Sequence, residues 1–215
     1  MTSGDRRLQP RKQPRQARAE LTRQRILDAA AHVFAEYGYA AGTTNRIAEQ
    51  AGISIGSLYQ YYPNKDAILA ELVGRHLADG AEAIGEAIRR SEEAEPPGTL
   101  EDTVRTLIRT AVENHLEDPR LLRIMAEQAP RSPELVERVA QQEQARTAYV
   151  RELIGRYPEV RVADPAVAAR LVVATVQFTV HSLIAAPDPV DVAAFENELV
   201  SMITRYLTGG PAGTA

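Results

Sequence analysis

The chain has 215 residues, 44% of them hydrophobic and 25% charged, a composition typical of soluble globular proteins with one or two domains. It has no Cys, which excludes disulfides and thiolate metal sites and fits a reducing compartment. The polar, basic N-terminus does not resemble a signal peptide, and the longest apolar run, residues 171–186, is too short and too polar to span a membrane, so we expect a cytoplasmic protein without membrane contact.

Charge is divided unevenly along the chain. Residues 1–66 hold ten Lys and Arg against six Asp and Glu, a net +4, whereas residues 67–215 hold fifteen against twenty-three, a net −8. The total of −4 argues against a polycation that coats nucleic acid. A basic first part followed by an acidic remainder favours a DNA-binding head on a body that DNA does not touch.

The first 19 residues carry six Lys and Arg and show no apolar periodicity. Pro10 and Pro14 disfavour helix, so we predict a disordered basic arm. It is either a solvated tail or an arm that reaches phosphates or a neighbouring minor groove.

A helix is predicted over residues 21–37, and Gly38 ends it. Its apolar residues recur with a 3.6-residue period and should pack under the helices that follow. These inward-facing residues are Ile26, Ala30, Val33, Phe34 and Tyr37.

The stretch from Thr43 to Tyr62 predicts two short helices joined by a tight turn. The hydroxyl of Thr43 or Thr44 can cap the first helix, and Gly52 can end it in the left-handed conformation. Ser54 is a good N-cap for a second helix over residues 55–61. This pattern is a helix-turn-helix, in which the second helix reads the major groove of DNA.

The candidate DNA contacts divide into phosphate contacts and base contacts. Helix N-termini attract phosphate, and tyrosine hydroxyls or an outward Arg can add to them. The candidate phosphate contacts are Thr43, Thr44, Arg46, Tyr59, Tyr61 and Lys65. The candidate groove-facing residues are Ser54, Gly56, Ser57 and Gln60, and the amide of Gln60 can read adenine.

Residues 25–69 resemble the DNA-binding domain of the tetracycline-repressor (TetR) family of bacterial regulators. The matching residues are 25–30, Phe34, Gly38, Tyr39, Thr43, Thr44, Ile47, Ala48, 51–54, Gly56, Leu58, Tyr59, Tyr61, Tyr62, 64–66 and Leu69. One departure is the segment 62–64, where the family more often has Phe before a variable residue. The resemblance implies a dimer that pairs through its last two long helices. It also implies a small effector molecule that moves the helix after the helix-turn-helix and releases the operator.

The rest of the chain predicts only helices. Asn64 caps a long helix that runs to about residue 90, a loop follows over residues 91–98, and Thr99 forms a capping box with Asp102. Four later helices begin with a capping residue followed by Pro, at residues 118–119, 132–133, 164–165 and 188–189. They are predicted over residues 119–129, 133–156, 165–185 and 189–207, which gives nine helices and an all-α fold.

We divide the chain into the arm (1–19), a DNA-binding domain (20–80), a helical regulatory and dimerisation domain (81–208) and a disordered tail (209–215). The helix over residues 165–185 is apolar nearly all round, and the one over 189–207 has an apolar stripe. We predict that this pair packs against its two-fold mate as a four-helix bundle in a homodimer. The alternative is that both helices are buried within one monomer.

The body has no strong chemical motif. Six residues beside apolar faces are candidates to line a ligand pocket, although each such residue is more often part of a core: His115, Met125, Gln128, Tyr149, Phe178 and His181. The four His residues lack metal-ligand spacing, so we expect no metal and no cofactor. No phosphate-binding loop, nucleophile elbow or carboxylate pair indicates an enzyme.

The sequence therefore predicts a homodimeric DNA-binding regulator, a repressor released from a palindromic operator by a small apolar or amphipathic ligand. One alternative is a ligand-independent activator or architectural protein that uses the same DNA-binding head. Another is an enzyme built on the helical body, which would require a buried polar cluster with perturbed pKa values.

Overall fold

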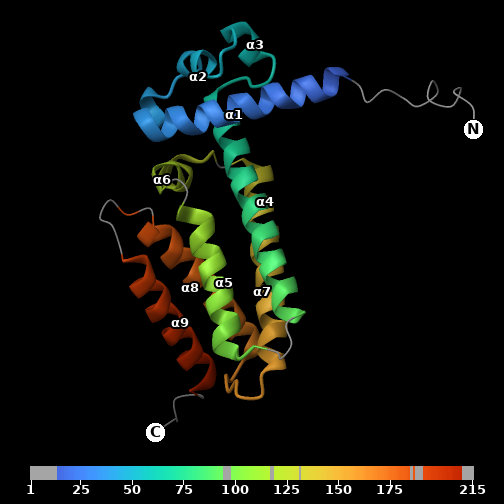
Figure 1. Ribbon diagram of the computed structural model, residues 1–215, viewed down its shortest axis with the longest axis vertical. Helices are drawn as coiled ribbons and strands as arrows, with labels where there is room; N and C mark the ends of the chain where they lie inside the picture. Colours follow the sequence, from blue (N-terminus) through green and yellow to red (C-terminus); the bar gives the residue numbers. More distant parts are fainter. Residues whose placement is uncertain are drawn as a thin grey trace, which may run out of the picture. The chain divides into compact units, whose positions relative to one another are not determined.

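The protein consists of helices joined by short connections in the computed structural model (Figure 1). The structure describes residues 14–93, 98–116, 119–130, 132–184, 186 and 191–209. Within these ranges there are nine helices and no strand, which confirms the all-α fold class. The helices are α1 (Pro14–Ala41), α2 (Thr44–Gln50), α3 (Ile55–Tyr59), α4 (Lys65–Glu92), α5 (Leu100–Leu116), α6 (Pro119–Gln128), α7 (Pro133–Arg156), α8 (Pro165–Ile184) and α9 (Val192–Thr208).

The chain forms two compact units, Met1–Leu72 and Val73–Ala215, and the boundary between them falls inside α4. The predicted domain boundary at residues 80 and 81 lies further along the same helix and stays a prediction. In the first unit α1 packs against α2, and α2 packs against α3. The largest fully buried side chains of this unit are Ile26, Phe34, Ile47, Leu58, Ile68 and Leu69. They come from all four helices, so one small core holds the helix-turn-helix together.

The first helix differs from the prediction in two respects. It begins at Pro14, seven residues before the predicted start, because Pro is well tolerated in the first turn, where its missing N–H has no partner to lose. Residues 14–19 are therefore helical, and the rest of the predicted arm lies outside the described residues. Tyr37, predicted to face the core, is 52% exposed. Gly38 has φ 74° and breaks the regular helix where the sequence predicted its end.

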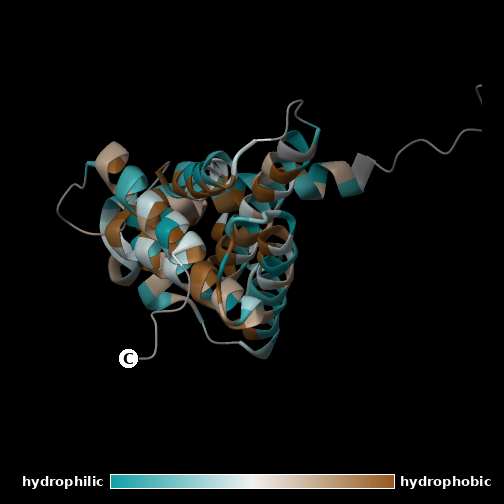
Figure 2. Ribbon diagram, turned by 90° about the horizontal axis from the view of Figure 1, so that it is seen from below, coloured by the Kyte–Doolittle hydropathy of each residue, from teal (hydrophilic) through white to brown (hydrophobic). Residues whose placement is uncertain are grey.

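The second unit is built around α8, which packs against α5, α6, α7 and α9, while α5 also packs against α9. Figure 2 shows brown, apolar residues concentrated between the helices and teal residues on their outer sides. The core of this unit comes from every helix of α5 to α9, with Ile108, Val112, Val180 and Val200 fully buried. The apolar stripes, which recur with a 3.6-residue period, thus face one another and form the core of a helical bundle.

Local capping signals fix most of the helix ends. The predicted box at Thr99 is present, because its hydroxyl accepts the Asp102 N–H at 3.1 Å and the Asp102 carboxylate accepts the Thr99 N–H at 3.2 Å. Ser132 caps α7, and Asp164 caps α8 by accepting two backbone N–H groups. The last helix begins at Val192 with Asp191 as its cap, three residues after the approximate start that the sequence predicted. The cap residue 118 and residues 188 and 189 lie outside the described residues.

Helix α8 is long and apolar enough to cross a membrane by length and composition, with a mean hydropathy of 1.5 over an 18-residue window. This finding goes beyond the sequence expectation, which held the apolar run to be too short. Only 28% of that window is buried within the single chain. Helix packing within the unit therefore covers one part of α8 and leaves another part without a partner.

Candidate functional site

Three local features fix the ends of the two helices in the helix-turn-helix. The Thr43 hydroxyl accepts the Arg46 N–H at 3.4 Å and so caps α2. Gly52 follows α2 with φ 64°, a left-handed conformation that favours glycine over any residue with a Cβ. The Ser54 hydroxyl accepts the Ser57 N–H at 3.1 Å and caps α3. The sequence predicted these three devices, since each depends only on neighbouring residues.

One stabilising contact of this motif was not predicted. The guanidinium of Arg25, on α1, donates to the Ala51 carbonyl at 2.5 Å and so binds a free carbonyl at the end of α2. Arg25 is separated from Ala51 by 26 residues, so only the folded chain brings them together.

The start of α3 presents small and polar groups to the outside. Ser54, Gly56 and Gln60 are exposed, and Tyr59 is 54% exposed, whereas Ser57 and Tyr61 are half-buried. The hydroxyls of Ser54 and Ser57 lie 2.8 Å apart and bond each other. Helix α3 ends at Tyr59, two residues earlier than predicted.

Neither the backbone conformation of Gly56 nor its neighbours within the chain require a glycine at this position. Its φ is not positive, and a Cβ built on it would meet nothing closer than the Ser54 hydroxyl at 3.9 Å. Neither backbone strain nor crowding inside the chain therefore requires a glycine here. A glycine at such an exposed helix start leaves room for a close approach from outside.

The other predicted phosphate contacts gather beside α3. The hydroxyls of Thr44 and Tyr59 lie 3.3 Å apart. The Arg46 guanidinium lies over the ring of Tyr37 at 4.4 Å from its centroid, which explains why that ring is exposed rather than buried. These groups stand on the surface of α2 and α3, and their phosphate contacts stay predictions.

Lys65 has a second role that the sequence did not indicate. Its ammonium donates to the Tyr39 carbonyl at 2.6 Å and to the Ala40 carbonyl at 3.4 Å, and it lies 4.2 Å from the centroid of the Tyr39 ring. A cation on the last carbonyls of a helix compensates the unpaired acceptors and the helix dipole. Lys65 therefore ties the start of α4 to the end of α1, and its phosphate contact stays a prediction.

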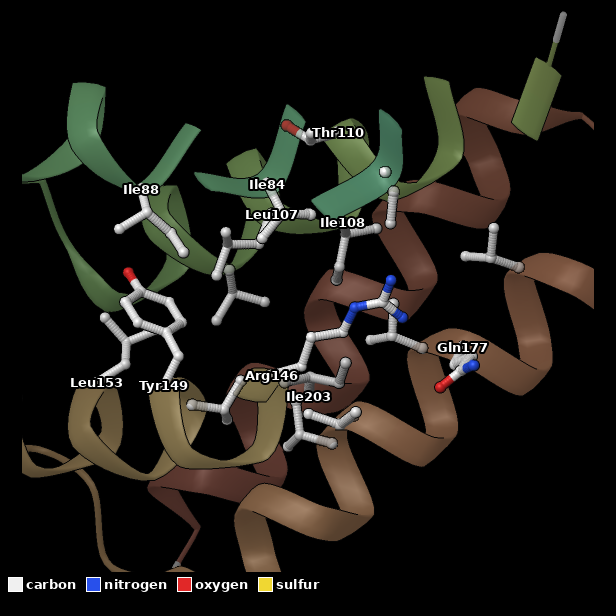
Figure 3. A pocket seen from close by; sticks show the side chains of 18 of the residues that line it. Ile84, Ile88, Leu107, Ile108, Thr110, Arg146, Tyr149, Leu153, Gln177 and Ile203 are labelled. Atoms are coloured by element: carbon white, nitrogen blue, oxygen red, sulfur yellow. The ribbon is translucent and has the colours of Figure 1, made fainter. Parts of the chain in front are cut away.

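The second unit contains a cavity of about 300 Å³, enclosed by residues of α4, α5, α7, α8 and α9. Its walls are mainly Ile, Leu and Val side chains (Figure 3). A few polar groups interrupt them, and Figure 3 shows Arg146 and Tyr149 from α7 and Gln177 from α8 at the cavity. A mostly apolar cavity with a few polar groups is the usual form of a small-molecule site.

The six predicted pocket residues divide evenly. His115, Tyr149 and His181 line the cavity. Met125 is buried in α6 and Gln128 is exposed at its end, and neither lines the cavity. Phe178 is 74% exposed on α8, so its assignment to the pocket was wrong. The helical period put Phe178 on an apolar face but could not tell which of two apolar faces is internal.

Arg146 is the pocket residue that the sequence analysis missed. Burial lowers the pKa of its guanidinium, and no ion pair joins it to an acidic side chain among the described residues. Helix α7 is polar, so an Arg in it is expected to be a solvated surface charge. Its sequence context therefore did not indicate that it lines a cavity. In the cavity it is a cation placed to receive an anionic group.

Three histidines come together beside this cavity. His76, His115 and His181 are half-buried, and their ligand nitrogens all lie within 4.8 Å of one another. Burial lowers the pKa of each imidazole, to about 4 for His115, so the three rings are neutral at pH 7. Spacing along the sequence argued against such a cluster, but its members come from three different helices. A buried polar cluster with perturbed pKa values is the feature that the enzyme alternative required, and the three imidazoles are potential metal ligands.

The two units together define a class of protein, a helix-turn-helix regulator with a helical body that encloses a pocket. Comparison with known families agrees. Residues 26–72 match the family described as bacterial regulatory proteins, tetR family, and residues 99–207 match the tetracyclin repressor-like C-terminal domain. The chain belongs to the TetR family of bacterial regulatory proteins.

Curated relatives are similar to part of this chain. It is 41% identical over 68 residues to the fatty acid metabolism regulator protein of Bacillus subtilis, a match that covers 32% of this chain and 31% of that protein. It is 40% identical over 53 residues to the HTH-type transcriptional repressor KstR of Mycolicibacterium smegmatis, which covers 25% of this chain and 26% of that protein. The chain thus matches less than a third of the length of these two relatives.

Solved structures are similar over most of the chain. A putative TetR-family regulator from Mesorhizobium loti aligns with a TM-score of 0.70 at 18% identity, covering 88% of this chain and 96% of that one. The regulator FadR from Bacillus subtilis, solved in complex with stearoyl-CoA, aligns with a TM-score of 0.63 at 21% identity, covering 85% and 98%. At these identities the comparison establishes the shared fold.

The contacts of Lys65 lead to a stability prediction. Replacing Lys65 with Met removes the ammonium from two carbonyls, so the free energy of unfolding should fall by about 1 kcal/mol, measured by urea titration. Arg46→Met is the control, since the Arg46 guanidinium is exposed and stacks only on a ring. Equal stability of Lys65→Met and wild type would contradict the capping role. The salt dependence of DNA binding tests the phosphate role separately, because loss of one contact lowers the slope by about one.

Proposed function

We propose that the protein is a homodimeric transcriptional repressor that binds a palindromic operator and leaves it when a small apolar or amphipathic molecule enters the body. The observation that carries this proposal is the exposed, capped start of α3, with Gly56 open to the outside, in a chain whose body encloses an apolar cavity. Such a protein acts in the cytoplasm, where the operator lies.

The DNA-binding part of the proposal rests on the surface of α2 and α3. The start of α3 would enter the major groove, with Ser54, Gly56, Ser57 and Gln60 toward the bases. Thr43, Thr44, Arg46, Tyr59, Tyr61 and Lys65 would face the phosphates on either side. In a two-fold dimer two such helices reach successive major grooves, roughly 34 Å apart, which makes the operator a palindrome.

The dimer part rests on apolar side chains that the single chain leaves uncovered. Val167, Leu171 and Phe178 on α8 are 52%, 50% and 74% exposed, and Met202 and Tyr206 on α9 are 50% and 44% exposed. An apolar surface on two neighbouring helices favours burial against a second copy. These exposed fractions favour the dimer over the alternative in which both helices are buried within one monomer.

The effector part rests on the composition of the cavity and on the relatives. Its walls accept an apolar chain, and the guanidinium of Arg146 can pair with an anionic head group. The names of two similar proteins mention fatty acid metabolism and a complex with stearoyl-CoA. We therefore propose an acyl compound with a carboxylate or phosphate head as the effector. A ligand-independent regulator would instead keep its operator in the presence of every such compound.

The experiment that tests the function is a titration of purified protein on the DNA that flanks its own gene, with sedimentation to fix the stoichiometry. We expect saturable binding of one or more dimers to a palindrome, and release on addition of long-chain fatty acids or their CoA esters. Weak binding to every fragment, erased by moderate salt, would contradict a specific operator in that DNA.

Gly56 gives a specific test of the DNA-binding surface. A methyl group on Gly56→Ala fits within the chain, so stability should be unchanged or slightly higher, whereas operator affinity should fall about tenfold or more. The matched control is Gly155→Ala at the end of α7, where an added Cβ meets nothing within 4 Å. Operator binding as tight in Gly56→Ala as in Gly155→Ala would show that the start of α3 does not enter the groove.

Phe178 gives a test of the dimer. A carboxylate in Phe178→Asp would be buried without a partner at the proposed interface, so at micromolar concentration the protein should sediment as a monomer. Val136→Asp on α7 is the control, because Val136 is 55% exposed but lies on neither of the two helices. A dimer that persists in Phe178→Asp would show that the interface does not include Phe178 and lies elsewhere.

Arg146 gives a test of the effector. Arg146→Gln keeps a polar side chain but removes the positive charge, so release of DNA by an anionic acyl compound should require about tenfold more compound or more. Arg151→Gln on the same helix, whose side chain is exposed, is the control. Equal sensitivity of both variants would show that the head group binds elsewhere.

A further inference from the structure

The three histidines of the second unit meet through one atom each. The Nε2 atoms of His76 and His115 lie 3.3 Å apart, and those of His115 and His181 lie 3.2 Å apart. The rings meet edge to face, with centroids 4.8 Å apart for the first pair and 4.4 Å for the second. Three residues distant in sequence, on α4, α5 and α8, thus direct the same nitrogen to a common point.

The other ring nitrogens settle the tautomers of two of these histidines. The Nδ1 atom of His115 lies 2.5 Å from the Ala111 carbonyl, and the Nδ1 atom of His181 lies 2.7 Å from the Gln177 carbonyl. A carbonyl oxygen only accepts hydrogen bonds, so each Nδ1 must carry a proton and donate it. In the neutral rings both Nε2 atoms then carry lone pairs, which face each other across 3.2 Å with no proton between them.

Two facing lone pairs require a cation between them, either a proton or a metal ion. A proton joins only two nitrogens, whereas a metal ion accepts the lone pairs of all three histidines, whose ligand nitrogens lie within 4.8 Å of one another. Neutral imidazoles with Nδ1–H bound to carbonyls are the state in which histidines bind metals.

We propose that His76, His115 and His181 bind one Zn²⁺ ion through their Nε2 atoms. In a tetrahedral site with Zn–N bonds of about 2.0–2.1 Å, neighbouring nitrogens lie about 3.4 Å apart. The separations of 3.3 Å and 3.2 Å fit this distance. The nitrogens of His76 and His181 lie up to 4.8 Å apart, so these two rings would move closer together when an ion binds. An all-imidazole set selects Zn²⁺ and its transition-metal neighbours over Mg²⁺ and Ca²⁺, which prefer oxygen ligands.

The site leaves one coordination position free. His115 and His181 also line the cavity, so the free position is reached from the cavity side. The guanidinium of Arg146 in the same cavity weakens binding of a bare dication but attracts an anion. The fourth ligand is therefore an anionic oxygen, from hydroxide or from a carboxylate that enters the cavity. The ion would form the polar end of a pocket whose other walls are apolar.

The test uses full-length, tag-free protein freed of metal by a chelator and then titrated with Zn²⁺ by calorimetry. We expect one ion per chain with micromolar affinity or tighter, and a rise in the unfolding temperature, since an ion bound only by the folded state stabilises it. Co²⁺ in place of Zn²⁺ should give the visible absorption of a four-coordinate site. Failure of both ions to bind, in protein that binds its operator normally, would overturn the proposal and leave the regulator intact.

Variants locate the site. His115→Gln and His181→Gln should each weaken Zn²⁺ binding at least about 100-fold, because each removes a direct ligand. His32→Gln is the matched control, since His32 is exposed in the first unit and should leave the affinity unchanged. Circular dichroism checks the fold, and His76→Gln supplies a third variant if one of the others unfolds. Binding that survives all three cluster variants would be adventitious and would contradict the site.

Discussion

Most of the second unit depends on one constraint, the apolar character of α8. A helix that is apolar nearly all round must be covered on most of its sides. Helices α5, α6, α7 and α9 cover part of it, and the residues they leave exposed include Leu171 and Phe178. The same helix supplies Val173, Val176 and His181 to the cavity wall. The cavity wall, which includes His181 of the histidine cluster, and the uncovered face are thus two sides of one helix, and a change in its packing affects both.

The features predicted correctly from the sequence are the local ones. Thr43, Gly52, Ser54 and Thr99 act through residues no more than four positions away, so spacing alone identified them. The predicted helix ends differed from the observed ones where two sequence signals competed. Pro14 suggested a break but is compatible with a first turn, and Asp191 caps α9 although an earlier Asp–Pro pair gave the stronger pattern.

The features that sequence reasoning missed depend on which helix faces meet. Arg25 binds a carbonyl 26 residues away, and the histidines of the cluster are separated by 39 and 66 residues. A helical wheel gives one apolar face to each helix but does not say which helix lies against it. Phe178 and His181 are three residues apart on α8, yet one is exposed and the other lines the cavity. The sequence pattern therefore predicted the helix-turn-helix but could not predict which side chains line the cavity.

Relatives share the fold over a longer part of the chain than they share its sequence. Sequence identity of about 40% is confined to matches of 53 and 68 residues, while the fold similarity extends over 85–88% of the chain at 18–21% identity. The fold is thus kept over most of the chain while most of the side chains differ. A pocket residue of a relative therefore does not identify its counterpart in this chain, and the roles of Arg146 and the three histidines rest on their own contacts.

Helix α4 gives the proposed regulation a physical basis. It begins at Lys65, whose ammonium holds the end of α1, and its later residues Gly80, Ile84 and Ile88 line the cavity. One continuous helix therefore contributes both to the core of the first unit and to the wall of the cavity. A ligand shifts an equilibrium only by the difference between its affinities for the two conformations. An occupant that prefers one position of α4 by about 2.7 kcal/mol changes the ratio of conformations about 100-fold, which is enough to lower operator occupancy without any contact between ligand and DNA.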